Sequence, residues 1–303
     1  MFTLFFVILQ INTQKNHKRY NTPHPFIIII SNKKDSQSYH FTKNPTLTMD
    51  NFNKSIFGLI GYPLGHSFSQ NFFNQKFESE GINAKYMNFE IPKIEDFQIV
   101  LSSNPRLSGL NVTIPYKQQV IPYLSSLDPT AAEIGAVNVI KISRNDKGEI
   151  TALKGYNSDV IGFVDSILPL LTPTHKKALI LGTGGASKAV AYGLKSLGIE
   201  PCFVSRTKAE GRYTYDELHM HPEILADHTV IVNTTPLGMY PHVDECPDIP
   251  YDYITPSHIC YDLLYNPDIT LFMKKCSEHG GITKNGLEML LMQAFAAWNI
   301  WKS

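Results

Sequence analysis

The sequence lacks the features that mark several classes of protein. Lys plus Arg number 27 and Asp plus Glu also number 27 among 303 residues, so the net charge is zero and no basic excess indicates a nucleic-acid partner. The four cysteines include no C-x-x-C pair, which favours reduced thiols in a cytoplasmic protein over disulfides. No apolar run reaches the roughly 20 residues of a membrane-spanning helix. We therefore expect a cytoplasmic protein that binds neither nucleic acid nor membrane.

The first 54 residues do not share the pattern of the rest. Two short apolar runs, at 2–9 and 26–30, stand in a polar context rich in asparagine and lysine. No positive charge precedes the first run and no small-residue cleavage site follows it, and Arg19 is the single arginine of the segment, so a targeting peptide fits poorly. We interpret residues 1–54 as a disordered extension without a function of its own, and favour Met49 as the start of translation.

From residue 55 onward, strand and helix patterns alternate. The apolar run 56–60 ends at Gly61, and Met87, Phe89 and Ile91 alternate with polar residues as in a half-buried strand. Helical patterns at 116–124 and 130–134 follow a further strand at 107–113. The turn 145–148 joins strands 137–142 and 149–153 into a hairpin. These elements predict an α/β domain over residues 55–155.

The second half predicts a parallel sheet. The continuous apolar run 177–181 is typical of a strand buried on both faces, and a helical pattern follows at 185–197. A helix at 159–171 precedes it, and further strands are expected at 202–204, 229–232 and 259–263. This βαβ series indicates a doubly wound, Rossmann-type domain over residues 156–284. Residues 287–298 carry a strong amphipathic helix pattern.

A glycine-rich turn joins strand 177–181 to the helix that follows. In such a turn the first glycine permits the tight bend and the second lets backbone N–H groups approach a phosphate at the helix N-terminus. Gly182 and Gly184 occupy these two positions, with Gly185 and Ala186 next, while Ser187 stands where a third glycine is usual. The turn predicts dinucleotide binding, the alternative being a plain tight βα turn.

The end of the next strand indicates which dinucleotide is bound. An NAD enzyme usually carries an acid there for the ribose 2′-hydroxyl. This chain has two hydroxyls and two cations instead, at Ser205, Arg206, Thr207 and Lys208. That composition suits a 2′-phosphate and predicts NADP, the alternative being a solvated basic loop.

Two further motifs supply a lysine and an aspartate. The segment 109–117 places Thr113 and Lys117 four residues apart where a strand pattern stops at a proline, and 155–159 ends on Asp159. A lysine beside an aspartate can relay a proton and stabilise a developing alkoxide. Taken singly, Lys117 is a solvated lysine at a helix start and Asp159 a first-turn acid. His219 and His221 have no third ligand at a suitable spacing, so we expect no metal site.

Together with the pattern G-x-P-x-x-H-S-x-S at 61–69, these motifs resemble those of shikimate dehydrogenases. Further matches, in family order, lie at 135–138, 233–239, 262–267 with Thr270, and 289–294. The resemblance covers residue 56 to the C-terminus. It implies two α/β domains around a cleft, with the C-terminal helix, 285–303, packing back on the substrate-binding domain.

The resemblance also implies an NADP-dependent reduction of 3-dehydroshikimate to shikimate in aromatic biosynthesis. Lys117 and Asp159 are then the catalytic pair. The residues implied to bind substrate are Ser67, Ser69, Thr113, Asn138, Tyr265 and Gln293. Those implied to bind the cofactor are Gly182, Gly184, Gly185, Ala186, Ser205, Arg206, Thr207, Thr234 and Met239.

The chain departs from the family pattern at a few positions. Ser205 stands where asparagine is frequent, Gln70 where proline is, and Ser158 and Val139 where threonine is. None of these removes a catalytic group. A quinate/shikimate dehydrogenase remains an alternative, as does a non-catalytic NADP-binding regulator, although such a regulator would be expected to have lost Lys117 or Asp159. We expect a monomer or a homodimer.

Overall fold

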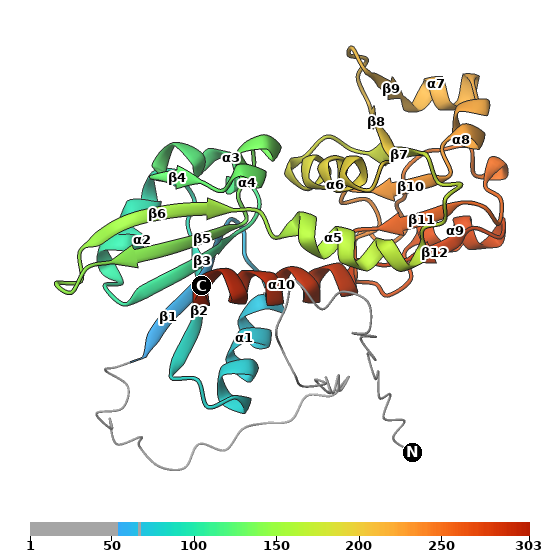
Figure 1. The fold of residues 1–303 in the computed structure, drawn as a ribbon. Helices are drawn as coiled ribbons and strands as arrows, with labels where there is room; N and C mark the ends of the chain where they lie inside the picture. Colours follow the sequence, from blue (N-terminus) through green and yellow to red (C-terminus); the bar gives the residue numbers. More distant parts are fainter. Residues whose placement is uncertain (1–53, 66–67) are drawn as a thin grey trace, which may run out of the picture. The chain divides into compact units, whose positions relative to one another are not determined.

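The computed structural model describes residues 54–65 and 68–303. The predicted extension, the predicted start at Met49 and the expected substrate ligand Ser67 lie outside these ranges. The described chain forms two six-stranded sheets, each covered by helices (Figure 1). Two α/β domains were predicted, and this part of the prediction is confirmed.

The first sheet is mixed. Its strands run in the order β2-β1-β3-β5-β6-β4, and β1 pairs in parallel with both β2 and β3. The predicted hairpin of β5 and β6 brings antiparallel pairing, because β5 runs against both β3 and β6. The strand bounds are β1 Ser55–Gly61, β2 Ala84–Glu90, β3 Leu107–Val112, β4 Ser126–Leu127, β5 Val139–Arg144 and β6 Ile150–Tyr156.

Apolar clusters cover both faces of this first sheet. On one face, α2 (Phe97–Ser103), α3 (Tyr116–Gln119) and α4 (Pro129–Ile134) contribute to a cluster that includes Leu110. On the other face, α1 (Phe68–Ser79) and α10 (Leu287–Lys302) pack with Tyr86 and Phe57. The prediction of a half-buried strand over 87–91 was therefore incomplete, because Tyr86 on its opposite face is wholly buried.

The second sheet is parallel throughout, with strand order β12-β11-β10-β7-β8-β9. The order reverses between β7 and β10, as in a Rossmann fold, where ligands bind beyond the carboxyl ends of the strands at this reversal. The strand bounds are β7 Lys177–Leu181, β8 Glu200–Ser205, β9 Arg212–Thr214, β10 Val230–Asn233, β11 Ile259–Asp262 and β12 Ile282–Lys284. The helices are α5 Asp159–Ile167, α6 Gly185–Ser196, α7 Tyr215–Met220, α8 Glu223–Asp227 and α9 Leu271–Glu278.

The crossover from β8 to β9 is short. Residues 206–211 join these parallel strands with a loop, where most parallel crossovers need a dozen or more residues and usually a helix. The strand β9 itself was not predicted, because its three residues are all partly exposed and show no alternation. The loop leaves the end of β8, where the NADP-selecting residues were predicted.

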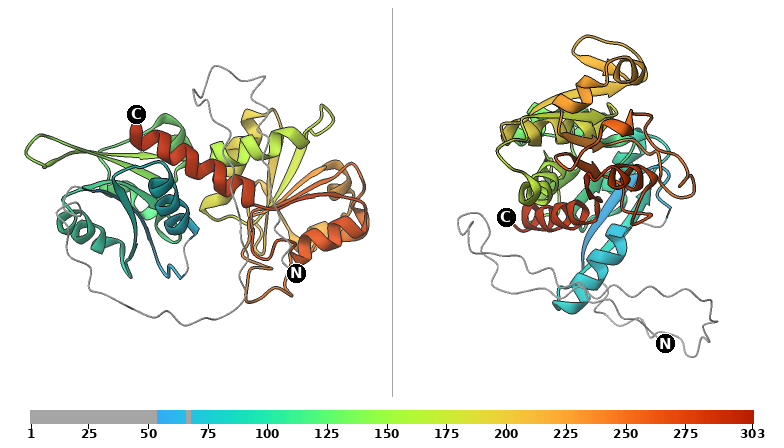
Figure 2. Two further views of the ribbon diagram at one scale, coloured as in Figure 1. Left: turned by 90° about the horizontal axis from the view of Figure 1, so that it is seen from below. Right: turned by 90° about the vertical axis from the view of Figure 1, so that its right-hand side faces the viewer.

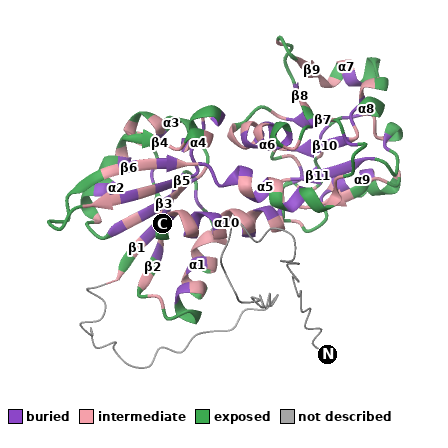
Figure 3. Cartoon of the chain, in the orientation of Figure 1, coloured by how far each residue is buried: buried purple, intermediate pink, exposed green. Residues whose placement is uncertain are grey.

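The helix α10 belongs to both cores (Figure 2). Its first turn places Met289 in the cluster beneath the parallel sheet, and its last turns place Trp298 and Trp301 in the cluster beneath the mixed sheet. The Trp301 indole donates to Ile140 O at 3.1 Å. Figure 3 shows buried residues along the central strands of both sheets and along α10. None of the helices in the described ranges is long and apolar enough to cross a membrane.

Candidate active site

Lys117 lies just past the carboxyl end of β3. The turn that carries it is fixed by backbone bonds, since Thr113 N donates to Ile60 O at 3.0 Å and Val137 N donates to Lys117 O at 2.7 Å. The adjacent Tyr116 is buried, and its hydroxyl donates to Ile91 O. The lysine therefore extends from a rigid support, with 17% of its side chain exposed.

Asp159 is the first residue of α5, 42 positions further along the chain. Its Oδ2 lies 2.7 Å from Lys117 Nζ, and its Oδ1 accepts a hydrogen bond from Asn138 Nδ2 at 2.8 Å. Only 3% of the carboxylate side chain is exposed, and the first turn of a helix favours its negative charge. The structure thus joins the two residues that the sequence could only place in separate motifs.

Asn138 orients this carboxylate. It is 3% exposed, its Oδ1 accepts from Ser158 N at 2.6 Å, and its Nδ2 also lies 3.0 Å from Ser158 Oγ and 3.3 Å from Gln293 Oε1. Both ends of the amide are thus engaged within the protein. Gln293 reaches this group from α10, which explains the polar residue on that mostly apolar helix.

Asn111 belongs to the same cluster, although it was not among the predicted site residues. Its Oδ1 accepts from the Tyr86 hydroxyl at 2.7 Å, and its Nδ2 donates to Asn138 O at 3.3 Å. The available signal was its position in the segment 109–117, two residues before Thr113 and on the same side of β3. Ser69, in the first turn of α1, hydrogen-bonds to the same Tyr86 hydroxyl.

Tyr265 comes from the opposite domain and meets the first turn of α1. Its ring packs edge-on against Phe68, with the ring centroids 6.2 Å apart. Burial raises the pKa of the Tyr265 hydroxyl, which therefore stays protonated at neutral pH. The contact places one predicted substrate residue beside the helix that carries another, Ser69.

The glycine turn has the geometry that dinucleotide binding needs. Gly182 has φ +107°, and a Cβ built there would lie 2.9 Å from Thr234 Oγ1, so a larger residue is excluded on both counts. The buried Ser187 donates to Gly184 O at 2.6 Å and braces the turn. A Cβ built on Gly184 would meet nothing within 4 Å, so the space beside the N-terminus of α6 is open to a phosphate.

This turn lies beside the lysine. A Cβ built on Gly185 would stand 3.7 Å from Lys117 Cβ and Cδ. The N-terminus of α6, where an anion is favoured, is therefore a near neighbour of the Lys117–Asp159 pair. Gly184 and Gly185 at the N-terminus of α6 would hold the pyrophosphate of a dinucleotide, which would supply hydride chemistry close to that pair.

Only some of the residues predicted to bind a 2′-phosphate, in the loop after β8, are available to a ligand. Ser205 Oγ donates to Thr207 O at 2.5 Å, and Arg206 and Thr207 are exposed. Lys208 Nζ instead lies 2.5 Å from Glu217 Oε1, and this ion pair lowers the pKa of the Glu217 carboxyl. Arg206 is therefore the better placed of the two predicted cations.

A buried aspartate supports the loops that follow β10 and β11. Asp262 accepts from Thr270 Oγ1 at 2.6 Å, Asn233 Nδ2 at 3.1 Å and Leu264 N at 3.0 Å. Burial raises its pKa to about 6, against the lowering effect of these bonds. Thr234 is the first residue after β10, and its hydroxyl donates to Leu181 O at 2.7 Å. Met239, further along the loop that follows β10, is 47% exposed.

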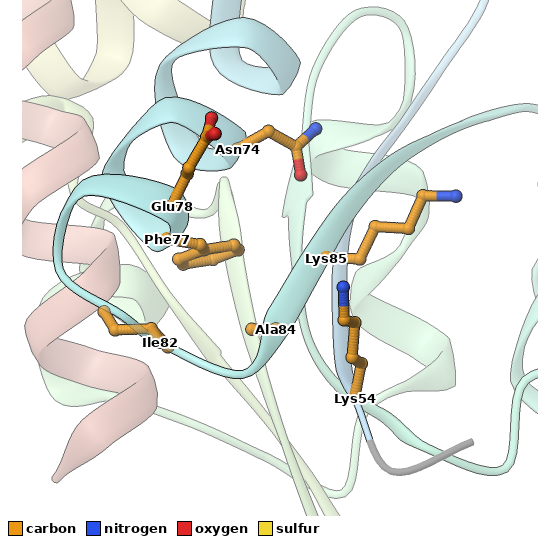
Figure 4. A pocket seen from close by; sticks show the side chains of 7 residues that line it. All are labelled: Lys54, Asn74, Phe77, Glu78, Ile82, Ala84 and Lys85. Carbon is orange, nitrogen blue, oxygen red and sulfur yellow. The ribbon is translucent and has the colours of Figure 1, made fainter. Parts of the chain in front are cut away.

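Two other features take no part in this cluster. Within the described ranges no group of three potential ligands is placed to hold a metal ion, and His219 and His221 pair with single acids. A hollow of about 410 Å³ (Figure 4) lies at the amino ends of β1 and β2, away from the Lys117–Asp159 pair, and is lined by Lys54, Asn74, Phe77, Glu78, Ile82, Ala84 and Lys85.

A Rossmann-type sheet whose glycine turn opens beside a Lys–Asp pair, with the lysine on the neighbouring α/β domain, is the architecture of a dinucleotide-dependent dehydrogenase. Residues 59–140 match the family model described as the shikimate dehydrogenase substrate binding domain. The shikimate dehydrogenase (NADP(+)) of Desulforamulus reducens is 36% identical over 265 residues, 81% of this chain and 89% of that protein. The chain belongs to the shikimate dehydrogenase family.

Solved structures agree with this assignment. The crystal structure of shikimate dehydrogenase from Aquifex aeolicus matches with a TM-score of 0.70 and 35% identity, covering 82% of this chain and 92% of that one. The shikimate 5-dehydrogenase from Thermus thermophilus in complex with NADP(H) and shikimate matches with a TM-score of 0.68 and 28% identity, covering 82% of this chain and 93% of that one.

Proposed function

We propose that the chain is an NADP-dependent shikimate dehydrogenase, which reversibly reduces 3-dehydroshikimate to shikimate for aromatic biosynthesis. The observation that carries the proposal is the 2.7 Å pair of Lys117 and Asp159, with Gly185 of the nucleotide turn directly beside the lysine. The four cysteines are free thiols, which supports the expected cytoplasmic setting. We keep the expectation of a monomer or a homodimer.

NADP(H), when bound, supplies or accepts the hydride. In the reductive direction we assign to Lys117 the proton that the developing alkoxide needs, together with electrostatic stabilisation of that oxygen. Asp159 holds the ammonium at 2.7 Å and receives a proton in the oxidative direction, relayed from the substrate hydroxyl through Lys117. Asn138 keeps the carboxylate turned toward the lysine.

We propose that the substrate lies against short polar side chains that surround this pair. Each can donate and accept hydrogen bonds, which suits a carboxylate that carries hydroxyls. The proposed substrate residues are Ser69, Asn111, Thr113, Asn138, Tyr265 and Gln293, together with Ser67. The proposed cofactor residues are Gly182, Gly184, Gly185, Ala186, Ser205, Arg206, Thr207, Thr234 and Met239. We place the boundary between the two domains at about residue 156, where β6 ends.

The test pairs an assay with one substitution. Reduction of NADP is followed with shikimate and with quinate, each repeated with NAD, in the wild type and in Lys117→Met. Methionine keeps much of the stem but carries neither charge nor proton, so we expect kcat with shikimate to fall by about 10²–10⁴-fold, with a smaller change in KM because the charge develops in the transition state.

Lys177→Met is the matched control. Lys177 also forms an ion pair, with Asp227 at 2.5 Å, but that pair is exposed and lies outside the cluster. We expect the control to retain normal turnover. A Lys117→Met enzyme that keeps more than about a tenth of the wild-type kcat would exclude the assigned acid–base role. A wild-type enzyme that oxidises quinate but not shikimate would contradict the proposed substrate.

A further inference from the structure

Tyr86 lies on the edge strand β2 and is wholly buried. Its ring stacks on Phe73 of α1, with the centroids 4.8 Å apart and the planes at 10°. Its side chain crosses β1, which lies between β2 and β3 in the sheet, and its hydroxyl reaches Asn111 on β3. A polar group buried this deeply persists in a fold only when its hydrogen bonds are made.

The backbone of Tyr86 is held as firmly as its ring. Asn74 of α1 donates from Nδ2 to Tyr86 O at 3.0 Å and accepts from Tyr86 N at 2.9 Å. Figure 4 shows Asn74 reaching from α1 toward β2. The amide thus takes the place of a neighbouring strand at this edge, and it ties Tyr86 to the helix that also carries Ser69.

The hydroxyl of Tyr86 has one proton to give. It donates that proton to Asn111 Oδ1 at 2.7 Å, because an amide oxygen only accepts. Ser69 hydrogen-bonds to the same hydroxyl from the first turn of α1. Burial raises the pKa of the Tyr86 hydroxyl, so it remains a neutral donor throughout the working pH range.

This bond decides which end of the Asn111 amide is available. With Oδ1 occupied by Tyr86, the Nδ2 side faces the cluster, where one N–H donates to Asn138 O at 3.3 Å. The remaining N–H is a donor for a ligand oxygen. A substrate that carries a carboxylate offers acceptors, so a site that presents the free N–H of Asn111 matches it.

We infer that Tyr86 is a positioning residue for substrate binding, acting through Asn111 to fix the direction of the amide donor that meets a substrate oxygen. The inference rests on the proposed function. Tyr86 lies on the far side of Asn111 from the Lys117–Asp159 pair, so its effect belongs to substrate affinity and not to the proton-transfer step. Neither the ring nor the hydroxyl reaches the nucleotide turn.

The test is Tyr86→Phe, which removes one oxygen and keeps the ring on Phe73. Loss of a hydrogen bond that leaves a buried acceptor unpaired should raise the shikimate KM, and the shikimate Kd from calorimetry without cofactor, by roughly 5- to 30-fold. We expect kcat to stay within about threefold and the NADP Kd to be unchanged, because Asn111 bonds to the backbone oxygen of Asn138 and not to the side-chain amide that holds Asp159.

Tyr261→Phe is the matched control. Tyr261 is equally buried and its hydroxyl lies 2.7 Å from Ser166 Oγ, but it belongs to the parallel sheet. We expect it to lower the melting temperature about as much as Tyr86→Phe without raising the shikimate KM. An equal rise in KM in both variants, or a fall in kcat alone in Tyr86→Phe, would overturn the inference.

A double-mutant cycle tests whether Tyr86 affects substrate binding through Asn111. If Tyr86 acts through Asn111, then adding Tyr86→Phe to Asn111→Ala should raise the shikimate Kd by less than about twofold beyond Asn111→Ala alone. Additive losses would overturn the route. Failure of the proposed function is distinguished beforehand, because it would appear as a wild type that neither binds nor oxidises shikimate.

Discussion

The substitution Gly162→Ala tests how the two domains hold the catalytic pair. Gly162 lies one turn after Asp159 on α5, where that helix crosses α10. A Cβ built there would lie 2.5 Å from Met289 O, 3.0 Å from Gln293 N and 3.1 Å from Gln293 Cβ. An ordinary contact of carbon with carbonyl oxygen is about 3.3–3.6 Å, so the two helices would have to separate by about 1 Å.

Two opposing effects set the expected loss of stability. Alanine is intrinsically the better helix former by about 1 kcal/mol. Overpacking against a backbone that cannot rotate away costs about 1–3 kcal/mol or more. We expect a net loss, seen as a melting temperature lower by about 2–8 °C for a domain pair of this size.

The effect on turnover should exceed the effect on stability. Asp159 and Gln293 lie on the two helices that must separate, and both contact Asn138. A misplacement of about 1 Å in a catalytic arrangement can cost on the order of 10²-fold in rate. We therefore expect kcat for shikimate oxidation to fall by about 30- to 100-fold at a temperature where the variant is fully folded, as monitored by circular dichroism.

Gly193→Ala provides the comparison. Its Cβ would also be crowded, at 2.9 Å from Phe163 Cδ1 and 3.0 Å from Val164 Cγ2, but these are side-chain atoms that can move. We expect a near-normal kcat in this variant. If Gly162→Ala raised the melting temperature and kept the wild-type kcat, the close crossing of α5 and α10 would have no bearing on catalysis.

Two further outcomes are expected. Arg206→Asp should weaken NADP binding by about 10–100-fold in calorimetry, through loss of a charge-assisted contact of roughly 1.5–3 kcal/mol, and should leave NAD binding nearly unchanged; an unaltered NADP:NAD ratio would show that Arg206 is only a solvated loop residue. Asp262 has a folded pKa raised from 3.8 to about 6, so the native state keeps a proton that the unfolded chain has released, and its contribution to the free energy of unfolding falls by about 2–3 kcal/mol as pH rises from about 4 to 6. Urea unfolding should show this decline in the wild type but not in Asp262→Asn, and equal slopes in both would contradict the raised pKa.

Most strands of the parallel sheet could be predicted from the sequence. The run 177–181 is apolar at every position after its first lysine because both of its faces are covered, and the structure places β7 there with α6 following. Local patterns of this kind depend on neighbouring residues and can be read along the chain. The strand β9 could not be predicted in this way, because its three residues are partly exposed and pair with β8 across a short loop.

The mixed sheet shows where such reading fails. Met87 and Phe89 alternate with polar neighbours, which indicated one buried face. The buried state of Tyr86 on the other face depends on α1 and α10, and α10 lies about 200 residues further along the chain. No local pattern records a contact over that separation.

The candidate site divides in the same way. The sequence by itself determined which chemical groups are present: the lysine, the aspartate, the glycine turn and the amphipathic helix at the C-terminus. Only the tertiary structure decided how they combine, with Asp159 at 2.7 Å from Lys117, Gln293 reaching Asn138, Lys208 paired with Glu217, and Tyr86 bound to Asn111. The physical reason is that short-range backbone preferences and hydrophobic periodicity act between near neighbours in the chain, whereas hydrogen bonds and ion pairs join whatever side chains the packed sheets and helices bring together.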